Sequence, residues 1–175
     1  MTGESSRRFL PWQERYADKL KTAREALRAI KRGDHIFIGS GAAYPRLLIE
    51  EMIKRSDSFV DTRIVHLLTI GPAPYVESRF RHRFRHNAFF IGANVRQAVA
   101  EGQADYTPVF LSEIPALFRR RRFHLDVALI QVTPPDRHGF CSFGVSVDIV
   151  KPAAESADII IAEVNPRMPW TLGDS

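Results

Sequence analysis

The hydrophobic positions of this chain fall into short apolar runs, which alternate with segments whose apolar residues recur every three or four positions. The runs offer apolar side chains to both faces of an extended backbone, which is typical of strands buried inside a parallel sheet. Strands are predicted at residues 35–39, 64–70, 88–92, 125–132 and 159–164. Because helical segments separate these runs, the pattern predicts an α/β domain with a mostly parallel sheet flanked by helices.

The segments between the runs predict the helices. Apolar side chains recur at helical spacing through residues 12–30, and Gly33 follows as a stop signal. Further helices are predicted at residues 45–54, 94–101, 111–118 and 147–156. Residues 1–11 lack such a pattern and are expected to be a flexible leader, ahead of one compact domain over residues 12–175.

Polar loops rich in glycine and proline follow the predicted strands. Their sequences are GSGAAYP at 39–45, GPAPY at 71–75, GANVR at 92–96, PPDRHGFCSFG at 134–144 and NPRMPWTLGDS at 165–175. In parallel α/β sheets, ligands bind beyond the carboxyl ends of the strands. The agreement among the five loops therefore predicts a functional site at that edge of the sheet.

The first loop offers backbone rather than side-chain chemistry. Gly39 and Gly41, on either side of Ser40, allow a ligand to approach the backbone closely, and the N–H groups of the following helix favour an anion or a carbonyl oxygen. A tight strand-to-helix turn accounts for the same glycines equally well. The loop lacks the third glycine of the dinucleotide fingerprint and the lysine of a phosphate-binding loop.

The later loops add side-chain candidates, each with two readings. Asn94 either caps its helix or contacts a ligand. His138 is either held by a turn that Asp136 organises or faces a ligand, and Asn165 lies between the last strand and Pro166. Glu163, at the end of the last strand, has the chemistry of a nucleophile or base, although exposed carboxylates are common at strand ends.

The charge and the single cysteine narrow the function classes. Lysine and arginine exceed aspartate and glutamate by 25 to 20, a formal net charge of +5. The four arginines at residues 119–122 are explained as cations at a helix C-terminus, which the helix dipole favours. Binding of a polyanionic small ligand is another explanation for the excess of positive charge. No nucleic-acid-binding motif occurs, so nucleic acid is not expected as a partner. Cys141 excludes an internal disulfide, suits a reducing cytoplasm, and is expected to be a small packing residue rather than a nucleophile.

Membrane and metal chemistry are not expected either. No apolar run approaches the roughly 18 residues needed to cross a bilayer, and no signal peptide precedes the charged N-terminus. No histidine, cysteine or acidic cluster has the spacing of metal ligands. The sequence therefore predicts no metal site and no permanently bound cofactor.

Two long stretches carry a family resemblance. Residues 134–144 and 164–175 resemble signature stretches of the acetyl-CoA hydrolase/transferase family, which includes 4-hydroxybutyrate, acetate and succinyl-CoA:acetate CoA-transferases. Residues 39–45, and residues 90–96 running on to 106–108, are also similar to it. The resemblance extends over roughly residues 12–175.

The resemblance implies the N-terminal half of an enzyme with a CoA-transferase type α/β domain. Acyl-CoA and a small carboxylate would be the substrates, the C-terminal domain would be the partner, and a homodimer is a further expectation. In this family a glutamate of the second domain attacks the thioester, and a glutamyl-CoA thioester then passes CoA to another carboxylate. No residue here matches that glutamate, so this chain alone is expected to be inactive. The residues expected to line the substrate site are Gly39, Ser40, Gly41, Asn94, His138 and Asn165.

Three alternatives remain open. This chain has Trp-Thr-Leu at residues 170–172, where many members of the family have a sequence similar to Arg-Thr-His. This difference leaves open which carboxylate accepts CoA and whether the enzyme transfers or hydrolyses the thioester. The chain would then be half of an acyl-CoA hydrolase. A non-catalytic binding or assembly module of the same fold is the second alternative. A sugar-phosphate isomerase of similar architecture is the third, against which the motifs argue.

Overall fold

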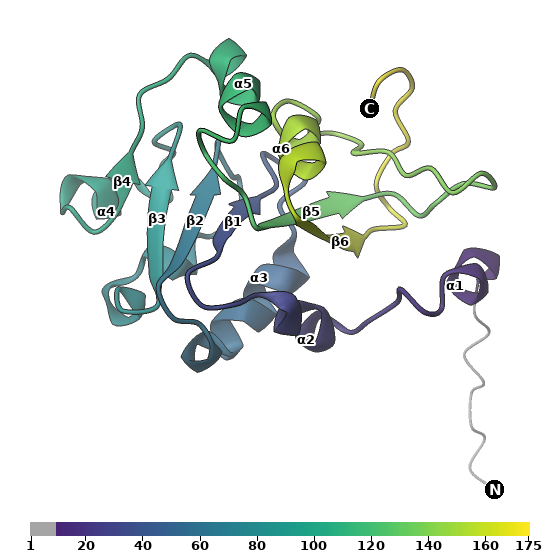
Figure 1. The fold of residues 1–175 in the computed structure, drawn as a ribbon, viewed down its shortest axis with the longest axis horizontal. Helices are drawn as coiled ribbons and strands as arrows, with labels where there is room; N and C mark the ends of the chain where they lie inside the picture. Colours follow the sequence, from purple (N-terminus) through teal and green to yellow (C-terminus); the bar gives the residue numbers. More distant parts are fainter. Residues whose placement is uncertain (1–9) are drawn as a thin grey trace, which may run out of the picture.

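A six-stranded, entirely parallel sheet forms the centre of the molecule (Figure 1). The structure, a computed structural model, describes residues 10–175, so the predicted leader lies outside the described residues except for Leu10 and Pro11. The strand order is β4-β3-β2-β1-β5-β6. The strands are β1 His35–Ile38, β2 Thr62–His66, β3 Phe84–Ala88, β4 Asp105–Tyr106, β5 Val127–Val132 and β6 Ile159–Val164. The predicted α/β class is confirmed.

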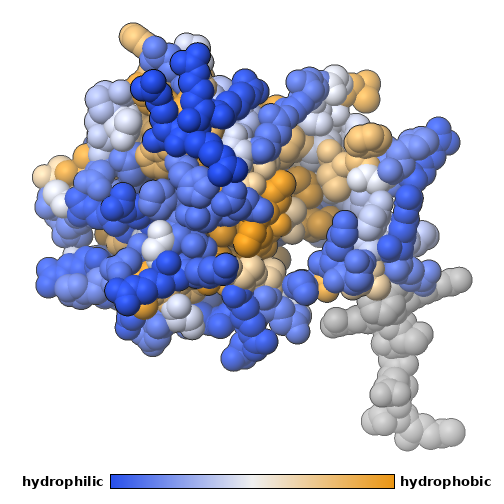
Figure 2. Space-filling model, viewed as in Figure 1, coloured by the Kyte–Doolittle hydropathy of each residue, from blue (hydrophilic) through white to orange (hydrophobic). Residues whose placement is uncertain are grey.

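Helices cover both faces of the sheet. They are α1 Pro11–Arg15, α2 Ala23–Ala26, α3 Arg46–Lys54, α4 Arg96–Ala100, α5 Ile114–Arg119 and α6 Val150–Ser156, with short 3₁₀ turns between them. Ile36 and Ile38 of β1 face the core beneath α2 and α3, whereas Phe37 faces the core beneath α5 and α6. The face seen in Figure 2 is largely hydrophilic, with hydrophobic residues visible near its centre. None of the helices between residues 10 and 175 has the length and apolar character needed to cross a membrane.

The strands at the two ends of the chain were predicted best. The prediction of β6 is confirmed at both ends, and those of β1 and β5 to within two residues. The boundaries predicted for the second and third strands were wrong, and β4 was missed. The side chains of β3 alternate between buried and exposed, and they include Arg85, His86 and Asn87, so its sequence lacks a continuous apolar run. The apolar run at 88–92 lies mostly in the loop after β3, where Phe89 is buried against the α5 side of the core.

The single helix predicted over residues 12–30 is wrong. The chain forms α1 and α2 with a non-helical segment between them, and Leu20 is exposed rather than packed. Thr22 starts the second helix, because its Oγ1 accepts from the N–H of Glu25 while the Glu25 carboxylate accepts from the N–H of Thr22. This capping box, a threonine followed three residues later by a glutamate, was the signal that the apolar spacing concealed.

Helix α3 receives its N-terminal cap from a distant strand. Its own N-cap residue, Pro45, offers no side-chain cap. Instead Oε2 of Glu163, on β6, accepts from the N–H groups of Leu47 at 2.8 Å and Leu48 at 3.3 Å. The other oxygen, Oε1, accepts from the amide of Gln131 at 3.1 Å. One carboxylate oxygen thus caps the helix N-terminus, where an anion is stabilising, and the other is held by Gln131. The structure therefore gives Glu163 a capping role and does not support its interpretation as a nucleophile.

Two histidines lie stacked in the core. The rings of His66 on β2 and His86 on β3 are 4.2 Å apart between centroids. His86 Nδ1 donates to the carbonyl of Ile64 at 3.1 Å, but its Nε2 and both nitrogens of His66 have no partner in the described part of the chain. Burial lowers the pKa of His86 to about 4, and burial together with the adjacent His86 holds the pKa of His66 well below its usual value. Both rings are therefore neutral in the folded protein at neutral pH.

Glu163→Ala is expected to lower the free energy of unfolding by about 2 kcal/mol, because two N–H groups of α3 and the amide of Gln131 lose their acceptor. Glu163→Gln keeps an oxygen for the helix and is expected to lose about half as much. Urea unfolding measures both values. Glu155→Ala is the matched control, since that exposed carboxylate lies 3.8 Å from Arg119 and contributes little. Equal losses in the two alanine variants would contradict the capping role.

The histidine pair predicts a loss of stability in acid. A histidine whose pKa is lowered in the folded state gains its proton on unfolding, so its contribution is complete above the ordinary pKa of 6.5 and declines as the pH falls toward about 4. His86→Phe is expected to reduce the stability difference between about pH 7.5 and about pH 5 by roughly 2 kcal/mol. Urea unfolding at the two pH values measures this difference. His82→Gln, at an exposed histidine, serves as the control, and an unchanged pH dependence in His86→Phe would refute the prediction.

Candidate functional site

The predicted loops gather at the carboxyl ends of the strands, as expected for a parallel sheet. The loop after β1 is joined to the loop after β2 by an isolated parallel bridge between Gly41 and Thr69. Within it, the N–H of Gly41 donates to the carbonyl of Leu68 at 2.7 Å, and the N–H of Ile70 donates to the carbonyl of Gly41 at 3.2 Å. The first two loops therefore form one continuous backbone surface.

Asn94 fastens the third loop to the second. Its amide donates to the carbonyl and the hydroxyl of Thr69, at 3.2 and 2.9 Å, and to the carbonyl of Gly71 at 2.8 Å. Its Oδ1 is buried and has no partner among residues 10–175. The helix-capping alternative is wrong, because α4 begins at Arg96 with Val95 as its N-cap residue.

The glycines of these loops are required by close contacts within the protein. Gly41 has a φ of 58°, and a Cβ there would lie 2.8 Å from the hydroxyl of Ser146. A Cβ on Gly71 would collide with the ring of Tyr44, whose hydroxyl donates to the carbonyl of Pro72 at 2.7 Å. Burial, reinforced by the nearby carboxylates, raises the pKa of Tyr44, so its hydroxyl remains a donor. The strand-to-helix turn is therefore packed tightly against its neighbours.

Gly39 and Ser40 lie beneath this surface. The N–H of Gly39 donates to the carbonyl of Leu129 on β5 at 2.8 Å, which continues the β1–β5 ladder by one residue. Ser40 is buried, and its hydroxyl has no hydrogen-bond partner in the chain from residue 10 onward. Both residues are therefore buried beneath the loops and do not contribute to the exposed surface at this edge of the sheet.

Asn165 lies on the other flank of this edge. Its amide donates to Oε1 of Gln131 at 3.1 Å, and its Oδ1 accepts from the N–H of Arg167 at 2.9 Å. Gln131 in turn donates to Glu163, the cap of α3. A series of hydrogen bonds therefore runs from Asn165, in the loop after β6, through Gln131 and Glu163 to the N-terminus of α3.

His138 is the one predicted residue that the structure keeps apart from the others. It lies near the tip of the loop between β5 and α6, which projects from the sheet beside α1 in Figure 1. Its backbone N–H donates to Asp136 at 2.8 Å, and its Nε2 accepts from Arg137 at 2.9 Å. Arg15 of α1 donates to the carbonyl of Arg137 at 2.7 Å, which braces the tip.

Asp136 organises this tip as predicted. Besides the N–H of His138, its carboxylate accepts from the N–H of Phe140 at 2.9 Å. Desolvation acts to raise the pKa of Asp136, but the backbone N–H donors outweigh it and hold the pKa below its usual value. The turn is therefore stabilised most when the carboxylate is charged.

A pair of hydroxyl groups joins the two family-like stretches. Ser142 Oγ is buried and accepts from the N–H of Gly144 at 3.0 Å and the N–H of Thr171 at 3.2 Å. The two hydroxyls lie 2.8 Å apart, and that of Thr171 donates to the carbonyl of Gly144 at 3.2 Å. Sequence reasoning did not assign this contact, and its only signal was the position of one hydroxyl in each stretch. These hydrogen bonds join the two loops directly.

The neighbouring thiol is not activated. Cys141 is exposed, so the expectation of a packing residue is wrong. Partial desolvation and the charge of Asp136 raise the pKa of the thiol, which disfavours the thiolate that a nucleophile requires.

Exposed apolar side chains border the loops at this edge, and we refer to them as the apolar rim. The rim consists of Leu68, Ile70, Phe90, Phe140, Val145, Trp170 and Leu172. Ile70 and Leu172 are the most exposed of these, at 76% and 88%. A group of exposed apolar residues beside polar loops is typical of a surface that contacts a partner or a ligand.

Comparisons with known proteins identify the family of this chain. Residues 4–175 match the acetyl-CoA hydrolase/transferase N-terminal domain. The 4-hydroxybutyrate coenzyme A transferase of Clostridium kluyveri is 46% identical over 166 residues, which cover 95% of this chain and 39% of that protein. The succinyl-CoA:acetate/propanoyl-CoA:succinate CoA transferase of Fasciola hepatica is 45% identical over 169 residues, 95% of this chain and 35% of that protein.

Solved structures show the same relationship. The 4-hydroxybutyrate CoA-transferase from Porphyromonas gingivalis has a TM-score of 0.76 and 33% identity over 93% of this chain and 37% of that one. RipA from Yersinia pestis has a TM-score of 0.84 and 27% identity over 94% of this chain and 41% of that one. The chain therefore spans about two-fifths of the length of these relatives. The resemblance noted in residues 134–144 and 164–175 is confirmed, and the chain belongs to the acetyl-CoA hydrolase/transferase family, whose N-terminal domain it matches.

Proposed function

We propose that this chain forms one wall of the active site of a CoA-transferase, which moves CoA between an acyl-CoA and a small carboxylate. The nucleophilic glutamate of the reaction would lie on a second domain. The observation that carries this proposal is the hydrogen-bonded assembly of the family-like loops at one edge of the sheet. Two candidate nucleophiles there are unsuited to the role, because Cys141 has a raised pKa and Glu163 caps a helix.

The proposed division of labour follows from the chemistry. A carboxylate nucleophile must meet the thioester carbonyl at about 3–3.5 Å, with donors already aimed at the developing oxyanion. The hydrogen bonds of Gly39, Gly41, Asn94 and Asn165 are made within the protein, so we assign these residues to positioning the loops. His138 is exposed and can contact a bound substrate directly. Rigid loops of this kind reduce the rearrangement needed when the second domain and the substrate arrive.

The apolar rim supports a docking role for the same edge. Phe90, Phe140 and Leu172 are exposed, and covering exposed apolar side chains with a partner lowers the free energy of the complex. We propose that the second domain covers part of the rim and that acyl-CoA occupies the space between the two walls. A homodimer of the complete enzyme and a location in the cytoplasm, which suits the exposed thiol of Cys141, belong to the same proposal.

Hydrolysis is the second candidate outcome. Trp170 and Leu172 are exposed and carry no cationic group that could bind a carboxylate, whereas many relatives have a sequence similar to Arg-Thr-His at residues 170–172. A site that binds the acceptor carboxylate weakly would let water complete the cycle instead. Transfer is favoured here because the named relatives of highest identity are CoA-transferases.

CoA exchange tests the proposed function. The chain, joined to the C-terminal part of the Clostridium kluyveri relative, is expected to exchange CoA between a short acyl-CoA and acetate, whereas the chain alone is expected to be inactive. Product formation is followed by chromatography of the CoA esters, with and without acetate. Thioester loss that does not depend on acetate would assign the hydrolase instead. Neither activity, in a chimera shown to be folded, would refute the catalytic proposal.

Ser142→Ala is expected to uncouple the two loops. The change leaves the N–H groups of Gly144 and Thr171 without their acceptor, so we expect a loss of about 2 kcal/mol in the free energy of unfolding. Because the loops form the proposed wall, kcat/KM of the chimera is expected to fall at least about tenfold. Ser112→Ala, at an exposed serine, is the control for both measurements. Unchanged stability in Ser142→Ala would show that the coupling is unimportant.

A further inference from the structure

Two carboxylates lie side by side at the amino-terminal edge of the sheet, opposite the candidate site. Asp126 immediately precedes β5 and Asp158 immediately precedes β6. These strands pair in parallel from Val127 with Ile159 onward, which makes the two aspartates neighbours across the strands. Like charges that face each other on neighbouring strands destabilise a sheet. Arg121 offsets part of this repulsion at Asp158, and a cation bound between the two carboxylates would offset the rest.

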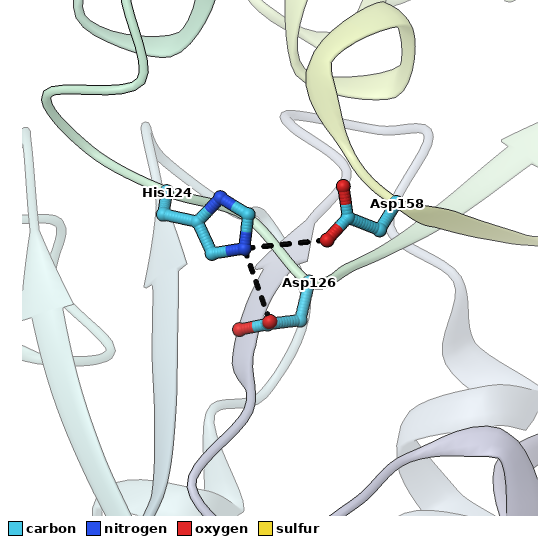
Figure 3. Close-up of side chains that lie close together, drawn as sticks. All are labelled: His124, Asp126 and Asp158. Carbon is cyan, nitrogen blue, oxygen red and sulfur yellow. Dashed lines mark hydrogen bonds and ion pairs between the residues drawn. The ribbon is translucent and has the colours of Figure 1, made fainter.

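A histidine ring points between the two carboxylates (Figure 3). Nε2 of His124 lies 3.1 Å from Oδ1 of Asp126 and 3.3 Å from Oδ2 of Asp158. The three atoms lie within 4.8 Å of one another. In a tetrahedral zinc site, bonds of about 2.0–2.2 Å place neighbouring ligand atoms about 3.4 Å apart. The distances from Nε2 match this spacing, and without an ion they are the distances of direct hydrogen bonds or ion pairs between His124 and the two carboxylates.

Each carboxylate is oriented by a second partner. The N–H of His35 donates to Oδ2 of Asp126 at 2.7 Å, which leaves Oδ1 turned toward His124. Arg121 lies 3.3 Å from Oδ1 of Asp158, which leaves Oδ2 turned toward the same ring. The imidazole of His35 also donates to the carbonyl of His124 at 3.2 Å and fixes the segment that carries the ring. Outer hydrogen bonds of this kind orient the ligands of metal sites.

We propose that His124, Asp126 and Asp158 bind a divalent transition-metal ion, and that zinc fits this set of nitrogen and oxygen ligands best. The three side chains leave a fourth position for water. The ion would neutralise both aspartates and clip together the starts of β5 and β6 and the chain that follows α5. Its role is structural, because the family-like loops lie at the other edge of the sheet, and it is independent of the proposed CoA transfer.

The sequence did not predict this site, because its ligands do not form a local pattern. His124 and Asp126 are two residues apart, but Asp158 comes after β5, a long loop and α6. Metal motifs are recognised when ligands share one turn or one helix. Here the register of the sheet brings the third ligand into place, so the expectation of no metal site rested on spacing alone.

Cobalt and zinc binding test the proposal. The full chain, freed of metal with a chelator, is titrated with Co²⁺, which gives intense visible absorption in tetrahedral sites, and Zn²⁺ is then added to displace it. We expect one equivalent to bind, and Zn²⁺ at about 100 times its Kd to raise Tm by roughly 5 °C or more. His124→Gln and Asp158→Asn each remove one ligand while keeping a similar side-chain size, and each is expected to weaken binding at least about tenfold.

Two further variants guard against binding elsewhere. Cys141→Ser removes an exposed thiol that cobalt could find, and His82→Gln removes an exposed imidazole outside the cluster. Both are expected to bind with unchanged affinity. The proposal is overturned if folded wild-type protein shows neither the cobalt spectrum nor the shift in Tm. It is equally overturned if Cys141→Ser abolishes binding, or if His124→Gln and Asp158→Asn retain it.

Discussion

All six strands run in one direction, with β1 paired to β2 on one side and to β5 on the other. Every connection must then return along the length of the sheet, so the loops after the strands collect at one edge and the loops before them at the other. The family-like stretches meet at the first edge because of this constraint, and Asp126 and Asp158 meet at the second. The two proposed sites thus depend on the same backbone pairing.

The sequence was most informative where a strand carries a nearly continuous apolar run, both in β5, which is buried throughout, and in β6, which lies at an edge of the sheet. β1, β5 and β6 were recognised because their apolar runs coincide with their hydrogen bonding, and the polar loops that follow them were placed at the correct edge. β3 and β4 lie at the exposed side of the sheet, where Arg85 and Asp105 pair with each other instead of packing in a core. Because β3 is rich in polar side chains and β4 has only two residues, an apolar run does not mark either strand. The family was recognised from residues 134–144 and 164–175, because a long ordered motif is specific without any knowledge of contacts.

The site residues were harder to predict, since their roles depend on partners remote in sequence. Asn94 was expected to cap its own helix or touch a ligand, yet its amide holds Thr69 and Gly71 in the preceding loop. The contact between Ser142 and Thr171 links the family-like stretches through hydroxyl groups that have no distinctive spacing. His138 looked central because of its chemistry, but the turn around Asp136 carries it toward α1. Local sequence thus located the edge of the sheet, and the tertiary contacts decided which side chains belong to its surface.

The cap that β6 supplies to α3 also has a consequence for synthesis of the chain. Helix α3 leaves the ribosome more than a hundred residues before Glu163, so its first N–H groups have no protein acceptor while the intervening strands are made. A helix of nine residues is marginal on its own in water. The order of assembly is therefore constrained: β6 must add to β5 before α3 can be fully fixed, so a strand that is synthesised much later completes a helix near the start of the sheet.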